Sequence, residues 1–167
     1  MPQRVEVDPN LSPAIFPSRV LNEICAHARE TLPEECCGLI AGDARVRQRL
    51  AYPCRNEMTR RHQLDPANFP RDGREGFYMN QLDYLKAVQE AEASGLRITA
   101  VYHSHVGFGV YLSEMDLEYA LHEAFPFPDA DHIVIAVFDG KITDVGLFER
   151  DPEASFLPGR FVLAGSP

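Results

Sequence analysis

The sequence predicts a mixed α/β (α+β) fold, in which helices and strands are interspersed and hairpins come late in the chain. Three observations favour this class. The 167 residues are 45% hydrophobic, which is enough for one domain with a buried core. Short apolar runs rich in β-branched side chains are typical of strands. Between them lie segments with helical periodicity and capping residues at their ends.

The first elements are a strand and a helix. Residues 4–7 alternate in polarity as a short strand does, and residues 16–33 have apolar side chains at helical spacing. Ser18 precedes these apolar positions, so we expect it to be the N-cap of the helix. Pro33 cannot continue a helix, so we expect the helix to end there.

A hairpin and an irregular segment follow. Residues 36–42 (CCGLIAG) form a compact apolar run that predicts a strand closed by glycine. Residues 44–53 alternate weakly and are expected to pair with it across a turn near Asp43. Residues 56–76 are rich in proline, glycine and charge, which indicates a partly irregular surface excursion.

The segment 80–95 is the clearest helix of the sequence. Asn80 is a good N-cap, and a glycine lies where the helix should stop. Leu82, Leu85 and Val88 form a stripe at helical spacing, so we expect them to face the core.

The second half of the chain predicts a strand, a helix, a hairpin and a last strand. The strand covers residues 96–105 and the helix residues 113–124. Residues 132–150 form a hairpin, because an Asp-Gly pair between two apolar runs is a strong turn signal. Residues 160–164 either close the sheet or pack loosely.

Composition narrows the function classes. The formal net charge is −9, whereas a nucleic-acid-binding protein is expected to carry a basic face. No apolar run is long enough to cross a membrane, and we expect no secretory signal. The cysteines lack the spacing of a disulfide framework or of a CxxC motif, so we expect a cytoplasmic protein. They are Cys25, Cys36, Cys37 and Cys54.

Two histidines at the end of a predicted strand indicate a metal site. Side chains at i and i+2 of a strand share a face, so His103 and His105 point the same way. Asp116 can add a carboxylate if the intervening loop folds back, which Gly107 and Gly109 make easier. Two histidines and one carboxylate are a known ligand set for catalytic Zn²⁺. The competing interpretation of Asp116 is a helix-capping pattern.

A hydrolytic zinc site also needs a general base. Glu34 and Glu35 lie at a junction of helix and strand, which can come next to the histidine strand in one sheet. The spacing does not choose between them, and two solvated acids after a proline are the alternative.

The complete pattern resembles a known family. Between residues 103 and 116 the sequence reads HSH, seven residues, Ser, two residues and Asp, which is similar to the metal motif of JAMM metalloproteases, the catalytically competent MPN-domain family. That family also has Glu, one residue and Cys-Gly opening an apolar strand, which is matched by Glu35, Cys37 and Gly38. The resemblance therefore selects Glu35 over Glu34.

The resemblance implies a structure and residue roles. The fold would be a central curved mixed β-sheet flanked by helices, with residues 1–167 as a single JAMM-type metalloprotease domain. His103, His105 and Asp116 would be the zinc ligands. Glu35 would orient and deprotonate the water, and Ser113 would hydrogen-bond the oxyanion or the attacking water.

The resemblance also implies a substrate. Family members cleave amide or isopeptide bonds after the C-terminal Gly-Gly of ubiquitin-like proteins, and small stand-alone members often act on sulfur carriers. We expect the carrier tail to add as a strand beside the catalytic strand. Residues 56–76 are expected to contact the carrier. Val106 and Leu112 replace prolines common in the family, which affects the shape of the loop rather than the metal ligands.

Two other functions compete. Two histidines and a carboxylate also suit the Fe(II) of a non-haem oxygenase. A non-catalytic MPN-like binding module is the second rival, although such scaffolds generally lack a ligand that this chain has.

Overall fold

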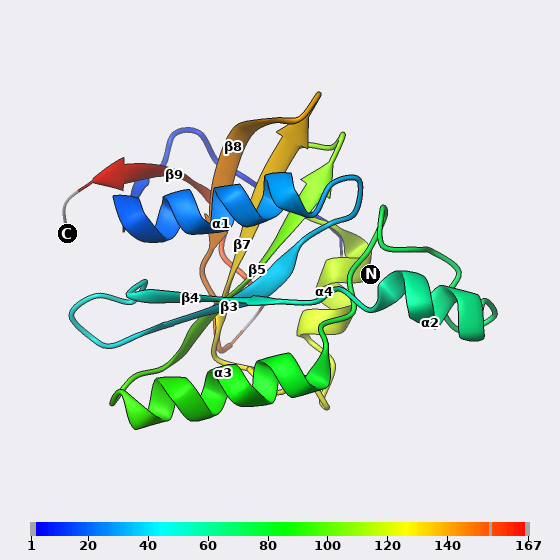
Figure 1. The fold of residues 1–167 in the computed structure, drawn as a ribbon. Coiled ribbons are helices and arrows are strands. Elements are labelled where there is room, and N and C mark those ends of the chain that lie inside the picture. The colour runs from blue at the N-terminus through cyan, green and yellow to red at the C-terminus, as the bar shows by residue number, and fades with distance from the viewer. Residues whose placement is uncertain (1–2, 154, 166–167) are drawn as a thin grey trace.

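A curved seven-stranded sheet forms the centre of the computed structural model, which describes residues 3–153 and 155–165 (Figure 1). Its strands are β2 (Ala14–Pro17), β3 (Cys37–Gly42), β4 (Leu50–Cys54), β5 (Arg97–Val106), β7 (Asp131–Phe138), β8 (Lys141–Phe148) and β9 (Arg160–Gly165). The order across the sheet is β2-β9-β8-β7-β5-β3-β4. The pairs β5–β7 and β2–β9 are parallel and the others antiparallel, so the predicted mixed sheet is confirmed.

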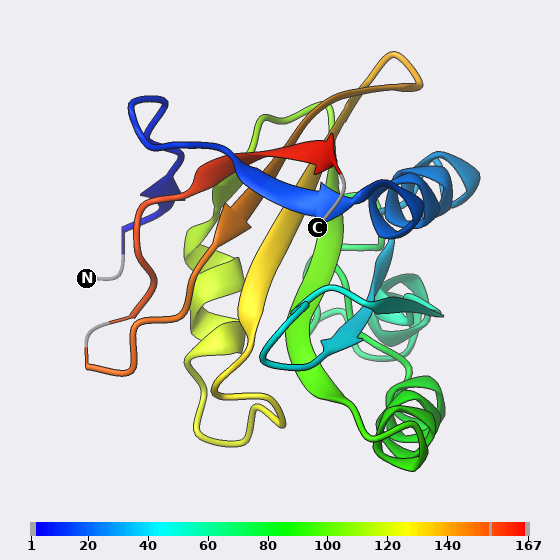
Figure 2. The same cartoon turned by 90° about the vertical axis from the view of Figure 1, so that its left-hand side faces the viewer.

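Helices lie on both faces of this sheet and beyond its end. They are α1 (Ser18–Glu30), α2 (Met58–Leu64), α3 (Gln81–Ala93) and α4 (Glu114–Ala120). Figure 1 shows α1 on one side of the sheet and α3 on the other, and Figure 2 shows α4 alongside the sheet. A two-residue pair, β1 (Val5–Glu6) with β6 (Tyr111–Leu112), leads into α4. No helix in the described part of the chain has the length and apolar character that a membrane crossing requires.

Alternation along β5 divides the core and orients the histidines. Ala100 and Tyr102 belong to the buried cluster that packs against α1. Val101 belongs to the cluster on the opposite face, under α3. Because side chains alternate along a strand, His103 and His105 point to the same face as Val101. The histidines therefore face the α3 and α4 side of the sheet.

The start of α1 differs from the sequence prediction. Ser18 is the first helical residue and not the N-cap, and Pro17 occupies the cap position without a side-chain hydrogen bond. The reason is β2, which pairs with β9 at the far end of the chain and runs directly into the helix. The last strand therefore joins the sheet, between β2 and β8, and does not pack loosely.

The buried face of α3 also differs. Leu82 and Leu85 are 73% and 45% exposed, so the predicted apolar stripe is wrong. The helix instead buries Ala87 and Ala91, whose small side chains let it lie close to the sheet. The predicted N-cap is confirmed, because the Asn80 side chain accepts a hydrogen bond from a backbone N–H in the first turn.

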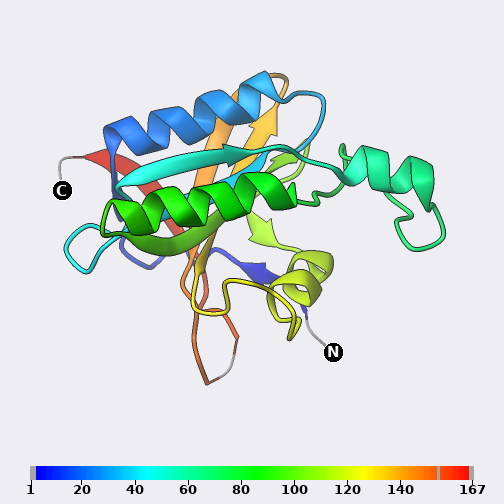
Figure 3. The same cartoon turned by 60° about the horizontal axis from the view of Figure 1, so that its bottom comes forward.

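Two connecting segments complete the fold, the turn between β7 and β8 and the excursion at 56–76. Asp139 and Gly140 both have positive φ angles, 50° and 74°, as the predicted tight hairpin turn between β7 and β8 requires. The excursion at 56–76 contains α2, a helix that the sequence analysis did not predict. Figure 3 shows α2 projecting beyond the end of the sheet.

A histidine outside the metal motif is buried in the core. His132 on β7 is 1% exposed and lies between Phe125 and Phe156, at ring-centroid distances of 5.7 and 5.1 Å. Neither ring nitrogen has a hydrogen-bond partner among the described residues. Burial, and secondarily the charge of His103, lowers the pKa of His132 to about 3. The fold therefore holds this imidazole in its neutral form.

Acid should destabilise the protein through His132. A group whose pKa falls on folding contributes full stability above its unfolded pKa of about 6.5, and this stability is lost as the pH falls toward the folded pKa. The loss is about 1.4 kcal/mol per pH unit, or about 2 kcal/mol between pH 6.5 and 5. Urea unfolding at pH 7 and pH 5, with a chelator present throughout, should show that His132→Leu removes this part of the loss. Equal pH dependence in both proteins would contradict the assignment.

Candidate metal centre

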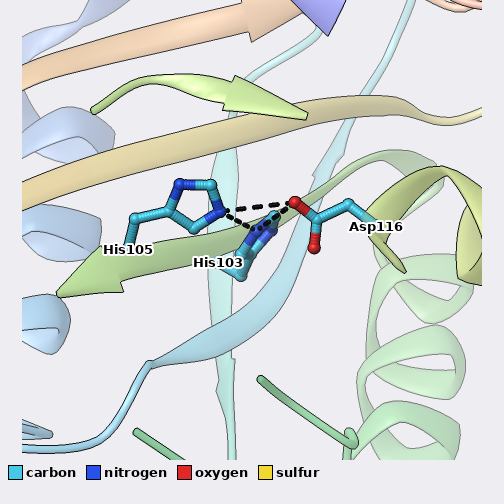
Figure 4. Close-up of side chains that lie close together, drawn as sticks. All are labelled: His103, His105 and Asp116. Carbon is cyan, nitrogen blue, oxygen red and sulfur yellow. Dashed lines mark hydrogen bonds and ion pairs between the residues drawn. The ribbon is translucent and has the colours of Figure 1, made fainter. Parts of the chain in front are cut away.

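Three side chains bring one ligand atom each to a common point. His103 and His105 come from the end of β5, and Asp116 comes from the first turn of α4 (Figure 4). The two Nε2 atoms are 3.1 Å apart, and each is 3.3 Å from Oδ2 of Asp116. Ligand atoms about 2.0–2.1 Å from one tetrahedral ion lie about 3.3–3.4 Å from one another. The buried triangle therefore has the size that a divalent metal ion needs.

Neighbouring groups orient the two imidazoles. Nδ1 of His105 lies 2.9 Å from the carbonyl oxygen of Gly109, which can only accept a hydrogen bond. The Nδ1 atom therefore carries the proton, and Nε2 presents its lone pair to the centre. His103 is stacked on Phe77, with ring centroids 4.7 Å apart and an interplanar angle of 27°. Gly107 has a φ of 82°, so the loop turns back there toward α4.

The geometry of Asp116 fits both of the interpretations that the sequence offered as alternatives, the helix cap and the metal ligand. Its Oδ2 accepts a hydrogen bond from the Ser113 N–H at 2.9 Å, and its own N–H donates to the Ser113 hydroxyl at 3.0 Å. This capping box holds the carboxylate in the position where it meets both histidines. Burial raises the pKa of Asp116, but interactions with His103 and His105 outweigh burial and hold it well below its usual value.

Leu112 anchors the capping box to the core. It precedes the N-cap, and it shares a fully buried cluster with Leu117, the fourth residue of α4. An apolar pair at these positions fixes the angle at which the chain enters a helix. The side chain that replaces the family's usual proline is therefore part of the support for Asp116.

The register of β3 on β5 places Glu35 near the histidines. Cys37 is paired with His103, and a backbone hydrogen bond continues the ladder past Cys37. The continued register puts Glu35 opposite His105, on the face that carries both histidines. Glu35 is 5% exposed. It lies outside the group of converging ligand atoms, which is the position of a neighbour rather than a ligand.

The environment of Glu35 favours its protonated form. Burial raises the pKa of its carboxyl well above the usual value, and the negative charges of Asp116 and Glu75 raise it further. The positive charge of Arg71 acts in the opposite direction. A carboxylate with a raised pKa is a better proton acceptor near neutral pH.

Glu34, the other candidate base, has a different partner. Its side chain accepts a hydrogen bond from the Thr59 hydroxyl, and a Cβ on Gly73 would lie 2.7 Å from its carboxyl carbon. Glu34 lies in the turn before β3, where its N–H donates to the Thr31 carbonyl oxygen at 3.0 Å, so the strand register that places Glu35 does not extend to it. Glu34 thus helps to hold the excursion against the body of the protein.

Asn56 is a structural residue of the site that the sequence analysis missed. Its side-chain amide donates to the carbonyl oxygens of Glu35 and Gly76, at 3.0 and 3.1 Å. Its side-chain oxygen accepts from the backbone N–H groups of Met58 and Tyr78, at 2.9 and 3.0 Å. Asn56 therefore clamps both ends of the excursion to the segment that carries Glu35. Its sequence signal was a polar residue at the start of the irregular segment that follows a strand.

Comparisons with known proteins agree with this geometry. Residues 17–150 match the family described as prokaryotic homologs of the JAB domain. The CysO-cysteine peptidases of Mycobacterium tuberculosis and Mycobacterium bovis are 27% identical to the chain over 121 residues, which are 72% of this chain and 70% of each relative.

Solved structures share the fold. Protein DSY2949 from Desulfitobacterium hafniense has a TM-score of 0.63 and 23% identity, and covers 92% of this chain and 94% of its own. A protein from Salinibacter ruber has a TM-score of 0.60 and 24% identity, and covers 92% of both chains. The family match extends from α1 to the end of β8 and includes every residue of the metal triangle. The chain belongs to the family of prokaryotic homologs of the JAB domain.

Proposed function

We propose that this protein is a zinc-dependent hydrolase that cleaves an amide or isopeptide bond after the C-terminal Gly-Gly of a ubiquitin-like protein, in particular a sulfur carrier. The family and the peptidase-named relatives support a JAB-type hydrolase. The observation that carries the proposal is the buried triangle of two imidazole nitrogens and one carboxylate oxygen with an acidic neighbour. We take residues 1–167 as a single JAMM-type domain.

The ligands in this proposal are His103, His105 and Asp116. Two imidazole nitrogens and one carboxylate oxygen suit Zn²⁺ and leave its fourth position open. Bound zinc supplies Lewis acidity, which polarises a carbonyl group and lowers the pKa of water. The same ligand set accepts Fe(II), which is the basis of the rival oxygenase function.

Glu35 and Ser113 complete the proposed chemistry. Glu35 takes a proton from the attacking water, whose oxygen bonds to the carbonyl carbon of the last glycine. The C–N bond breaks, and Glu35 returns the proton to the leaving nitrogen, so that an acid and an amine result. The Ser113 hydroxyl already accepts one hydrogen bond and keeps its own hydrogen to donate to the developing oxyanion. One such donor contributes about 3 kcal/mol.

The existing pairing of β5 limits where the carrier tail can add as a strand. β7 occupies one edge of β5 as far as Val106, and β3 occupies the other edge as far as His103. In this proposal the tail therefore approaches the histidines at the end of β5 beyond His103, and not along the length of the strand. The relatives named CysO-cysteine peptidase support a carrier protein as the partner.

The proposed activity can be tested directly. Ubiquitin-like carriers from the same genome, each extended past Gly-Gly, should be shortened to the Gly-Gly end when incubated with the zinc-loaded protein. Intact-mass measurement identifies the cleaved bond. Oxygen-dependent turnover by an iron-loaded protein, with no cleavage of any carrier, would support the oxygenase instead.

Metal binding should depend on the triangle. We expect one zinc ion per chain in the wild type and a loss of stoichiometric zinc in His105→Ala, because two ligands hold the ion much less firmly. His122→Ala is a matched control, since His122 is exposed and its side chain accepts a local hydrogen bond from the backbone N–H of Ala124. Elemental analysis gives the ratio of zinc to protein. Zinc should raise the unfolding temperature of the wild type and of His122→Ala, but not that of His105→Ala. Equal zinc content in all three proteins would contradict the assignment.

The role of Glu35 has a neighbouring control. Glu35→Gln should lower kcat by about 10²–10⁴-fold while zinc content stays at one per chain, because only the proton acceptor is removed. Glu34→Gln keeps an oxygen to accept from Thr59 and should stay within about twofold of the wild type. Rates come from cleavage of the carrier identified above. Full activity in Glu35→Gln would remove Glu35 from the mechanism and favour a different base.

A further inference from the structure

A cavity of about 400 Å³ adjoins the metal centre. Its walls come from the excursion and from α4, and Asp116 belongs to both the cavity and the metal triangle. Phe77 also lines it, and this ring is stacked on His103. The cavity therefore lies next to Asp116 and His103, two of the three proposed ligands. A second cavity, of about 640 Å³ between α1, β4 and α3, contains none of the three ligands.

The inner surface of this cavity is mostly apolar. Met58 and Phe69 line it from the excursion, and Met115 and Tyr119 from α4. The backbone of Gly76 lies close to two flexible thioether ends, since a Cβ there would be 3.2 Å from Met115 and 3.4 Å from Met58. Methionine side chains adapt to the shape of what they contact. The volume and lining suit a small apolar group.

Arg71 provides a cation at this cavity. It is exposed and forms no ion pair with any residue of the described ranges 3–153 and 155–165. Nearby arginines are engaged, because Arg74 pairs with Asp72 at 3.2 Å and Arg61 lies 4.4 Å over the Tyr78 ring. Arg71 is thus available to an anion in the cavity.

The position of Arg71 indicates which side of the scissile bond the cavity faces. In the proposed reaction, Glu35 gives its proton to the leaving nitrogen, so the group released lies on the side of Glu35. The segment that carries Arg71 contacts Glu35 directly, because the Glu35 N–H donates a hydrogen bond at 2.7 Å to the carbonyl oxygen of Gly73, two residues after Arg71. The cavity with Arg71 therefore lies on the leaving-group side.

We propose that this cavity binds the group released by cleavage and that Arg71 binds its free carboxylate. The inference rests on the proposed function and narrows it. The preferred substrate is a carrier extended past Gly-Gly by one residue, or very few, with an apolar side chain and a free C-terminus. A lysine within a folded protein places no carboxylate at Arg71. A guanidinium recognises a carboxylate through paired, charge-assisted hydrogen bonds.

The test compares two forms of one substrate. The carrier is extended past Gly-Gly by a single methionine, with its C-terminus either free or amidated. The wild type should show kcat/KM at least about tenfold higher for the free acid, because the amide removes the charge that Arg71 binds. Arg71→Ala should cleave both forms within about twofold of each other, at the rate of the wild type on the amide. Arg74→Ala is the matched control and should keep the wild-type preference.

Binding gives a second readout that is independent of turnover. Calorimetry of acetyl-Gly-Gly-Met with the Glu35→Gln protein should show tighter binding of the free acid than of its amide. Adding Arg71→Ala to that protein should abolish the difference.

The outcomes separate the two proposals. If the wild type cleaves neither form, nor any other extended carrier, the proposed hydrolase function is wrong. If it cleaves the acid and the amide equally well, the hydrolase stands and the carboxylate site is overturned. If Arg71→Ala keeps the preference for the acid, another group binds the carboxylate and the assignment of Arg71 is wrong.

Discussion

The carboxylate of Asp116 is the constraint on which the site depends. One oxygen accepts the N–H of Ser113 and lies 3.3 Å from both imidazole nitrogens. The start of α4 and the geometry of the metal triangle are therefore fixed by the same atom. Leu112 and Leu117 secure that helix start in the core. A substitution that shifts α4 would therefore open the triangle even where it touches none of the three side chains.

The central sheet positions the second carboxyl group of the site, that of Glu35. The pairing of β3 with β5 aligns Glu35 with the histidine face, and Asn56 ties the excursion to the backbone of Glu35. The environments of Asp116 and Glu35 then shift their pKa values in opposite directions. Contacts with two histidines hold the pKa of Asp116 low, whereas burial and the charge of Asp116 raise that of Glu35. Such a separation is typical of a site in which one carboxylate binds and the other moves protons.

The segment between β4 and α3 surrounds the proposed site. Its Phe77 stacks on His103, its Met58 and Arg71 line the adjoining cavity, and the carbonyl oxygen of its Gly73 accepts the Glu35 N–H. Loops positioned by a rigid sheet commonly determine which substrate a shared fold accepts. The sheet and α4 hold the chemical groups, and the segment between β4 and α3 shapes the space around them.

Local patterns in the sequence were enough for the mixed fold class, the Asn80 cap, the Asp-Gly hairpin and the residues of the metal triangle. Each depends on neighbours a few positions apart, where strand alternation and turn chemistry act directly. Spacing did not separate Glu35 from Glu34, because that choice depends on the register of two strands more than sixty residues apart; only the family resemblance selected it. The Ser18 cap and the leucine stripe of α3 were wrong for the same reason. Pairing of β2 with the last strand and burial of Ala87 and Ala91 on α3 depend on tertiary contacts. The roles of Asn56 and Arg71 likewise exist only where the folded chain brings distant groups together.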